Sequence, residues 1–285
     1  MHFLMIISTI CLSVTLRLIS PTVGSRWQES WQRSLFFFFF PPLLLSMTFV
    51  SIFCMGYRGQ MFGMTTGWFP YLLAITFCAS AVLLLVKHSL QAWQSIQQIN
   101  RFPLIDIAGE KARILEMDFP YIAQVGFWRS QLIVSRGLLN CLSHQQLQAV
   151  LAHEKAHRDC HDTFWFFWLG WLRSLTQYLP NTEAWSQELL RLRELRADWQ
   201  AAQQQDPLLL AESLLIITKM VDEKPFTSPC QAVAMPLDGA MPTYRLTERI
   251  EFLLEDTNPS INSGWWNWGW IVLIFLPLAM IPWHS

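Results

Sequence analysis

The stretch LSHQQLQAVLAHEKAHRDCHD, residues 142–162, is rich in histidine and charge, whereas the chain around it is strongly apolar. Its first residues predict a helix, because Ser143 is a good N-cap residue and Gln146, three positions later, completes a capping box. A helix that begins there carries His153 and His157 one turn apart on the same face. The stretch therefore predicts a well-capped helix that presents two imidazoles together.

The composition of the whole chain is unusual for a soluble protein. Of its 285 residues, 52% are hydrophobic and only 14% are charged, whereas an ordinary soluble domain is nearer about a quarter charged. The formal net charge of −1 gives no electrostatic reason to expect direct binding to nucleic acid. These figures favour a membrane protein that carries one sizeable polar domain.

Four apolar segments are long enough to cross a bilayer, which takes ~20 residues in a helix. These segments are residues 2–20, 35–57, 68–86 and 265–283. The residues between the third and the fourth hold most of the charge and are numerous enough to bury a core of their own. The sequence therefore predicts a membrane region at 1–87 with three spans, a polar domain at 88–263, and a fourth span with a short tail at 264–285.

Basic residues in the short loops set the expected orientation. Arg26 and Arg33 lie between the first two segments, with Arg17 at the edge, whereas the next loop holds only Arg58. The positive-inside rule then places the polar domain in the cytoplasm and both ends of the chain outside. We expect a multi-pass protein of the cell membrane, in a bacterial inner membrane or an internal membrane, in contact with lipid. A transporter is disfavoured, because Arg17 is the only charged residue within the spans.

The polar domain shows both strand and helix patterns. Short, partly alternating runs broken by Pro120 and Gly126 predict a small antiparallel sheet within 112–135. Helical patterns follow, and the domain is therefore expected to be α+β. Beyond the helix that starts near residue 144, the expected helices are 181–205, 207–221 and 246–256, with a loop at 223–243. The aromatic run 163–175 is too short for an ordinary span; we expect a buried or interfacial helix, with a re-entrant membrane helix as the alternative.

The pair His153 and His157 has the spacing that zinc peptidases use. Two imidazoles four residues apart on a helix can bind one zinc ion at ~2.0–2.1 Å each. Glu154 follows the first histidine and projects toward the open side of the metal, where it can take a proton from water. This H-E-x-x-H pattern also arises by chance, but its place on a capped helix after a predicted sheet favours the functional interpretation.

A catalytic zinc site needs a third protein ligand. His161 continues the same helix face, but its Cα lies ~12 Å along the axis from that of His153, too far to share one ion. The predicted helix at 181–205 offers Glu194 as the ligand, and Asp198, one turn later, as the acceptor for a ligand histidine's free N–H. In the alternative, both carboxylates lie on a solvated face and pair with Arg191, Arg193 or Arg196.

A family resemblance supports the zinc interpretation. AVLAHEKAHRDCHD followed by ELRADWQAA resembles the membrane-bound gluzincin peptidases, with Asp162 at the acidic position five residues after the second histidine. WRSQLIVSRGLLNCLSHQQLQAVLAHE, residues 128–154, is similar to the bacterial β-lactam sensor-transducer (BlaR/MecR-type) peptidases. The CAAX prenyl peptidases and heat-shock membrane proteases are more distant. The resemblance covers about 110–256. It implies a multi-pass helical membrane protein with an inserted α+β zincin-like peptidase domain, Zn²⁺ at His153, His157 and Glu194, and Asp198 and Asp162 beside the ligands.

Two departures from these families bear on function. No extracellular penicillin-binding domain follows the fourth segment, so a β-lactam sensor is not expected. The distant relatives also carry a histidine near their last domain helix that is thought to stabilise the oxyanion, and TYRLTERIEFLL has none. Tyr244, Arg245 or Arg249 takes that role in our interpretation, or no side chain does.

The expected activity is zinc-dependent hydrolysis of peptide bonds in a protein substrate. An edge strand can hold an extended substrate by adding a strand to the sheet. We expect this strand at Gln131, Leu132, Ile133, Val134 and Ser135. A non-catalytic metal-binding receptor is an alternative, but it would have no need of Glu154 as a base.

A second group of residues, rich in sulfur, suggests a site that senses a metal ion. Cys54, Met55, Met61 and Met64 lie at the predicted outer mouth of the membrane region, and soft sulfur ligands suit Cu(I). The alternative is packing by adaptable methionines at the membrane border. Together with the resemblance, this cluster suggests a signalling protease that cleaves a cytoplasmic, winged-helix transcriptional repressor when copper is present outside. The rival role is quality control of membrane proteins.

Overall fold

The computed structural model describes residues 2–19, 27–61, 64–65, 67–223, 243–254 and 269–283. The chain divides into two compact units. The first comprises residues 1–87, 171–192 and 259–285, and the second comprises 88–170 and 193–258. Residues 171–192, which the sequence analysis assigns to the polar domain, thus belong to the same unit as the apolar N-terminal helices.

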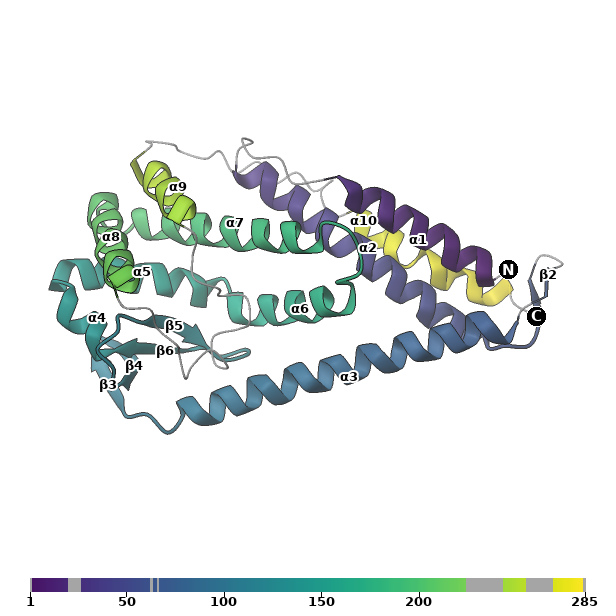
Figure 1. Cartoon of the computed structure of the whole chain (residues 1–285), viewed down its shortest axis with the longest axis horizontal. Coiled ribbons are helices and arrows are strands. Elements are labelled where there is room, and N and C mark those ends of the chain that lie inside the picture. The colour runs from purple at the N-terminus through teal and green to yellow at the C-terminus, as the bar shows by residue number, and fades with distance from the viewer. Residues whose placement is uncertain are drawn as a thin grey trace. The chain divides into compact units, whose positions relative to one another are not determined.

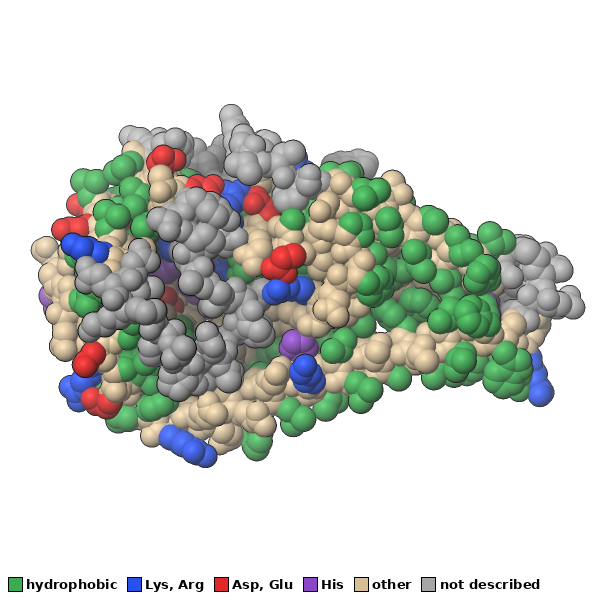
Figure 2. Space-filling model, in the orientation of Figure 1, with side chains coloured by type: hydrophobic (Ala, Val, Ile, Leu, Met, Phe, Trp, Pro, Cys, Tyr) green, Lys and Arg blue, Asp and Glu red, His purple; other side chains and the backbone are tan. Residues whose placement is uncertain are grey.

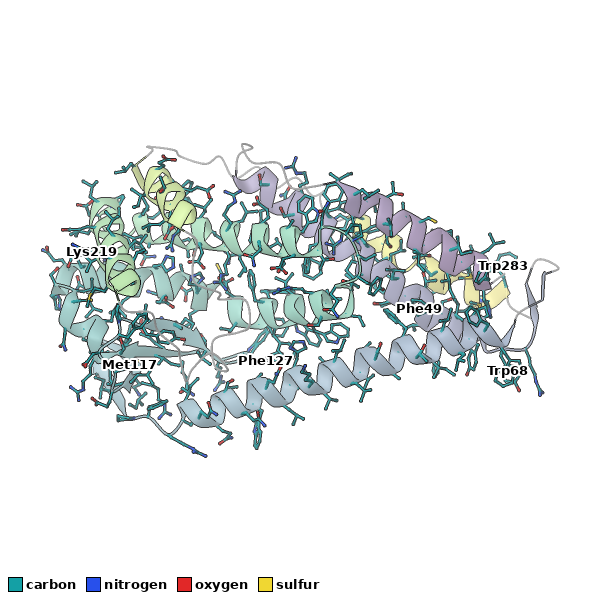
Figure 3. The ribbon with its side chains drawn as sticks, viewed as in Figure 1. Phe49, Trp68, Met117, Phe127, Lys219 and Trp283 are labelled. Atoms are coloured by element: carbon teal, nitrogen blue, oxygen red, sulfur yellow. The ribbon has the colours of Figure 1, made fainter. Side chains whose placement is uncertain are left out.

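The first unit is a set of apolar helices (Figure 1). Helix α2 (Trp27–Met55) packs against α1 (His2–Leu18), against the short α10 (Trp270–Ile274) and against the 3₁₀ helix η2 (Leu276–Trp283). The hydroxyl of Ser51 donates to the carbonyl of Pro277 at 2.7 Å, which ties η2 to α2. Phe49 of α2 is buried and stacks on Phe77 with ring centroids 4.3 Å apart (Figure 3).

Within the described residues, two helices are long and apolar enough to cross a membrane: Ser30–Met55 and α3 (Trp68–Ile99). Helix α3 continues beyond the predicted span at 68–86 and has 32 residues. Helix α1 is apolar but has only 17 residues. A two-stranded ribbon of β1 (Gln60–Met61) and β2 (Met64–Thr65) lies between α2 and α3 in the sequence.

The predicted fourth span is not one α-helix in its described part, which begins at residue 269. The α-helix α10 ends at Ile274 and η2 follows. Pro277 accounts for the change, because it has no N–H to continue the α-helical hydrogen bonds. Residues 265–268 of this prediction lie outside the described part of the chain.

A four-stranded sheet forms the base of the second unit. Its strands are β3 (Leu104–Ile107), β4 (Glu110–Leu115), β5 (Ile122–Val125) and β6 (Gln131–Ser135), in the spatial order β3-β4-β6-β5. Strands β4 and β6 are parallel, and the other two pairs are antiparallel. The prediction of a purely antiparallel sheet is therefore wrong, because a connection of more than a hairpin's length separates β4 from β6 and lets them run the same way.

Helices cover one face of this sheet. Helix α5 (His144–Asp159) packs against β5 and α8 (Pro207–Glu223), α8 packs against α9 (Thr243–Leu254), and α4 (Arg136–Cys141) contacts β6 and α8. The core between them includes Ala112, Ile114, Leu132 and Val134 of the sheet and Leu147, Val150 and Leu151 of α5. The capping box of Ser143 and Gln146 at the start of α5 is present as predicted.

Helices α6 (Asp162–Leu175) and α7 (Thr182–Ala202) each contribute residues to both units. The aromatic run at 163–175 is thus helical, and Phe166, Phe167 and Leu169 within it are buried. In Figure 2 the charged side chains lie mostly over the second unit, whereas the visible surface of the first unit is largely hydrophobic.

Candidate metal centre

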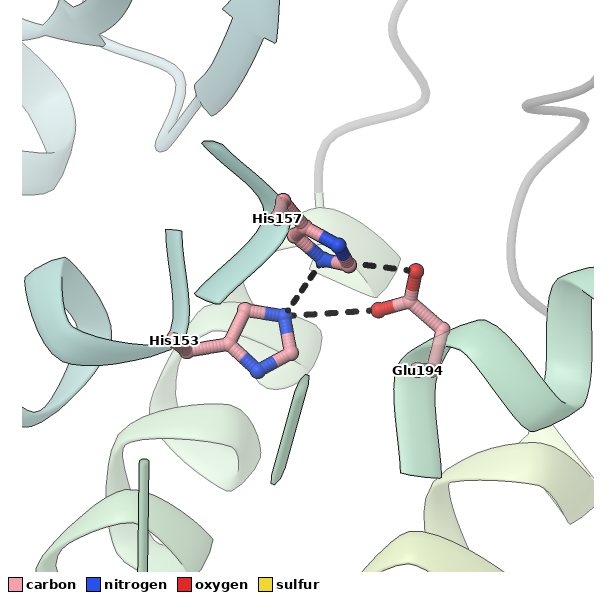
Figure 4. Close-up of side chains that lie close together, drawn as sticks. All are labelled: His153, His157 and Glu194. Atoms are coloured by element: carbon pink, nitrogen blue, oxygen red, sulfur yellow. Dashed lines mark hydrogen bonds and ion pairs between the residues drawn. The ribbon is translucent and has the colours of Figure 1, made fainter. Parts of the chain in front are cut away.

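Helices α5 and α7 bring three potential ligands together (Figure 4). The Nε2 atoms of His153 and His157 are 3.1 Å apart. Glu194 places Oε2 at 3.4 Å from Nε2 of His153 and Oε1 at 3.7 Å from Nε2 of His157. All three side chains are largely shielded from solvent, with 8%, 9% and 13% of their side-chain surfaces exposed. Four atoms with lone pairs thus converge on one small region.

These distances fit a tetrahedral zinc ion. Two ligand atoms that each lie ~2.1 Å from a tetrahedral ion are ~3.4 Å apart, which matches the separations between the imidazole nitrogens and the carboxylate. Imidazole nitrogen and carboxylate oxygen are also the donors that zinc takes in hydrolytic enzymes. The residues present therefore fit a zinc ion held by His153, His157 and Glu194.

Carboxylates hold the far side of each imidazole. Nδ1 of His153 lies 2.8 Å from Oδ1 of Asp198, and Nδ1 of His157 lies 2.7 Å from Oδ2 of Asp162. The contact of His157 is a hydrogen bond, whereas that of His153 is an ion-pair contact. A carboxylate beside Nδ1 favours the proton on that atom and leaves the Nε2 lone pair free for a metal. Asp198 and Asp162 are both buried. The structure thus places both sequence-predicted acidic residues against the ligand histidines.

Each of these carboxylates is in turn paired with an arginine. Arg249 of α9 forms a two-point contact with Asp198, Nε to Oδ2 and Nη2 to Oδ1, both at 2.6 Å. Arg196 binds Asp162. Arg193 donates to Oε1 of Glu194 at 2.7 and 2.9 Å. A buried carboxylate is expensive without a partner, so these arginines make the dense acidic site compatible with burial.

The pKa shifts reflect this arrangement. Burial alone would lower the pKa of His157, but Glu194 and Asp162 outweigh burial and raise the pKa to about 9. The pKa of His153 is also raised, against burial, by Asp198 and Glu194. Burial would raise the pKa of Glu194, yet Arg193 and His157 hold it well below its usual range. Protons and a metal ion therefore compete for the same imidazole atoms.

Glu154 follows His153 on α5 and is buried, with 8% of its surface exposed. Burial would lower the pKa of Arg249, but the surrounding carboxylates Asp198, Glu194 and Glu154 raise it. Arg249 itself contacts Asp198 and Glu194. The site therefore contains one carboxylate that is not needed to hold either histidine.

The predicted substrate strand needs a correction. Residues Gln131–Ser135 form β6, which is hydrogen-bonded to β4 on one side and to β5 on the other. A strand paired on both sides has no free N–H and C=O groups to add another strand. The edge strand next to α5 is β5, and the sheet face that carries α5 includes Ile122.

The structure also locates the other predicted residues. Arg249 contacts Asp198 and lies 3.5 Å from Oε2 of Glu194, and its role toward an oxyanion stays a prediction. The side chain of Tyr244 lies outside the described residues, as do those of Met61 and Met64. Cys54 is exposed, whereas Met55 is buried in the core of the first unit.

Sequence reasoning missed the roles of the arginines. Arg193 and Arg196 entered only as partners in an alternative that placed Glu194 and Asp198 on a solvated face. Arg196 contacts Asp162, 34 positions away, and the pattern RELRAD has no signal for that contact. The contact of Arg249 with Asp198 joins residues 51 positions apart, and local sequence has no signal for it.

The comparison with known families supports a metallopeptidase. Within that class, residues 121–180 match the sequence model of peptidase family M48, whose members are generally zinc-dependent. The matched segment contains β5, β6 and α5, and with them His153, Glu154 and His157, whereas Glu194 lies beyond it. No curated protein and no solved structure gives a significant match to the chain.

Proposed function

We propose that the protein is an integral membrane zinc metalloendopeptidase. The observation that carries the proposal is the convergence of both Nε2 atoms and the Glu194 carboxylate at zinc-like separations. The match to family M48 over the segment that contains the two histidines supports the same activity. The two helices long enough to cross a membrane support membrane attachment.

In the proposed hydrolysis, each residue of the site has a distinct role. A zinc ion held by His153, His157 and Glu194 would supply a Lewis acid that polarises a carbonyl oxygen and lowers the pKa of water. Glu154 acts as the general base, which accepts the proton of the attacking water and passes it to the leaving amine. Asp198 and Asp162 keep both imidazoles in the tautomer that leaves Nε2 free.

Strand β5 is the proposed docking edge for the substrate. An extended peptide can pair with the free edge of this strand and so cross the sheet beside α5. Gln124 of β5 supports this role, because its buried Oε1 has no hydrogen-bond partner among the residues that the structure describes. A buried acceptor without a partner is costly, and a backbone N–H of a bound peptide would satisfy it.

The test is cleavage by the full-length protein in a defined bilayer, with an unfolded protein such as casein as the probe. Glu154→Gln keeps the size of the side chain and removes its basicity, so the variant should retain zinc and lose cleavage. Lys155→Gln, a neighbouring exposed position, is the matched control and should cleave normally. Cleavage by Glu154→Gln at the wild-type rate would remove the general base from the proposal.

The physiological role that we propose is signalling. The peptidase cleaves a cytoplasmic transcriptional repressor when an external signal, such as copper at the segment around Cys54 and Met55, reaches the membrane region. The resemblance of residues 128–154 to repressor-controlling peptidases is the reason for this proposal. An ion acts in this way only to the extent that it binds one arrangement of the protein more tightly than another.

Proteomics of a deletion strain with and without added copper separates this role from quality control of membrane proteins. Signalling predicts that one repressor accumulates and that the copper response disappears. Accumulation of many damaged membrane proteins, with no repressor stabilised and no copper response, would exclude signalling while leaving the peptidase activity in place.

A further inference from the structure

A cluster of aromatic side chains lies on the second unit and includes none of the candidate metal ligands. It is formed by the loop between β5 and β6 and by the first half of α6. Its members, called here the aromatic cluster, are Phe127, Trp128, Phe164, Trp165, Phe167 and Trp168. The peptidase mechanism uses none of these rings.

The loop that presents the cluster is tightly built (Figure 3). Gly126 has φ +148°, and a Cβ at this position would lie 2.5 Å from the carbonyl oxygen of Arg129, so only glycine fits. The hydroxyl of Thr163 donates to the carbonyl of Phe127 at 3.2 Å and joins the loop to the start of α6. The loop therefore holds its aromatic residues in fixed positions.

The rings contact one another, and Phe167 is buried, but three of the six leave much of their surface uncovered. Phe127 meets Phe164 and Phe167 edge-on at centroid distances of 5.0 and 5.1 Å, and Trp128 meets Phe164 at 5.0 Å. Even so, Trp128 is 61% exposed, Trp165 is 55% exposed and Phe127 is 37% exposed. Soluble proteins rarely leave such a group of large rings in water, and a patch of this kind marks an interaction surface.

The polar groups of the aromatic cluster and of the neighbouring Arg129 suit contact with lipid headgroups. The indole N–H groups of Trp128 and Trp165 have no hydrogen-bond partner within the described ranges, and an indole of this kind suits the boundary between acyl chains and headgroups. Arg129 at the loop tip is exposed, and no described residue forms an ion pair with it. A cation beside exposed indoles complements an anionic membrane surface.

The chain itself provides a reason to expect a membrane as the partner of this surface. Two of its helices are long and apolar enough to cross a bilayer, so a lipid surface is available to the second unit without any further partner. We propose that the aromatic cluster, with Arg129, docks the second unit onto the headgroup region of an anionic membrane. This docking goes beyond the proposed peptidase activity and does not depend on it.

Photolabelling of the full-length protein tests the proposal. The protein is placed in single-copy nanodiscs of phosphatidylcholine and phosphatidylglycerol that contain a lipid with a diazirine either near its headgroup or at the end of an acyl chain. Single copies exclude contact with a second chain. After irradiation, mass spectrometry measures lipid attachment at 127–130 and 163–168 and, as controls, around Leu104 and Leu208, which are also exposed apolar residues of this unit.

The headgroup-proximal probe should label the cluster well above both controls, and the acyl-end probe should label it weakly. Removal of phosphatidylglycerol should reduce the labelling by about fivefold, because one cation near an anionic surface contributes about that factor to binding. In the Arg129→Gln protein, the labelling should no longer depend on phosphatidylglycerol. The same result is expected from the Glu154→Gln protein, so a failed peptidase and a failed docking surface are distinguishable. Labelling of the cluster no higher than at Leu104 and Leu208 would overturn the proposal.

Discussion

At the scale of single residues, the metal centre depends on charges that are paired one by one. Nδ1 of each ligand histidine faces a carboxylate, and each of those carboxylates binds an arginine. Such a chain of contacts fixes the direction of both Nε2 lone pairs before any metal arrives. The orientation of the ligands is therefore a property of the protein, and the loss of an orienting residue should weaken metal binding without removing a ligand.

Asp198→Ala tests this orienting role. The change removes the partner of Nδ1 in His153, and zinc affinity should fall by ~10–100-fold, because the imidazole is no longer held in one tautomer and direction. Zinc affinity is measured by competition with a chelator of known strength. Asp159→Ala is the control, because Asp159 is exposed and lies on α5, the helix that carries His153. The zinc affinity of this variant should match that of the wild type. Equal affinity in both variants would contradict the orienting role.

The raised pKa of His157, about 9, leads to a pH dependence. Without metal, the proton on His157 stabilises the fold fully below the unfolded-state pKa of ~6.5, and this contribution is lost as the pH rises through about 9. Zinc must displace that proton, so its affinity should rise from pH 6.5 to pH 8.5, by up to about tenfold per pH unit for this group. Competition with a chelator at several pH values measures the zinc affinity. A pH-independent affinity would contradict the assignment of His157 as a ligand.

Much of the site at this scale was predictable. The grouping of His153 with His157 follows from helical spacing alone, and the pattern RELRAD together with the family resemblance led to Glu194. The arginine contacts were not predictable in the same way. Asp162 and Arg196 meet only when the start of α6 and helix α7 come together, and periodicity within one helix says nothing about that packing.

At the scale of elements, the main difference from the sequence-based prediction is the strand order of the sheet. Alternation of apolar residues located β4, β5 and β6, because it depends only on which face of a strand is buried. Alternation does not report which strands are neighbours. The insertion of β6 between β4 and β5 therefore had to come from the structure, and it moves the free edge from β6 to β5.

Helix α9 is the element that closes the metal centre through Arg249. Arg249→Met leaves Asp198 buried without its partner, and the loss of one member of a buried ion pair costs ~3–5 kcal/mol. The melting temperature of the metal-free, detergent-solubilised protein should fall markedly. Arg136→Met is the matched control, because Arg136 and Glu116 form an exposed pair that contributes little. Equal melting temperatures for the two variants would show that Arg249 does not anchor α9.

At the scale of the whole molecule, the chain folds as two units whose boundaries do not follow the sequence in order. Residues 171–192 join the first unit although they lie between two parts of the second. The sequence analysis divided the chain into an apolar part and a charged part, and it assigned this segment to the charged part by its position in the chain. The side-chain contacts of Asn181 and Trp185 with the end of α1 show why it belongs to the first unit.

The orientation in the membrane is a prediction of the arginine distribution. Arg17, Arg26 and Arg33 should keep the first loop in the cytoplasm, and the second unit with it, while the C-terminus lies outside. Reporter fusions after Gln97 and after Ser285 measure the location of each point. A cytoplasmic signal after Gln97 and an external one after Ser285 are expected, and a cytoplasmic signal after Ser285 would contradict four spans.

The central claim is that His153, His157 and Glu194 hold one zinc ion, and the zinc content of the purified full-length protein tests it most directly. Wild type and Glu154→Gln should each contain about one zinc per chain, because three protein ligands remain in both. His157→Ala and Glu194→Ala should each lose it to a similar extent, with circular dichroism as the control for folding. Full zinc retention by a folded Glu194→Ala protein would contradict the claim.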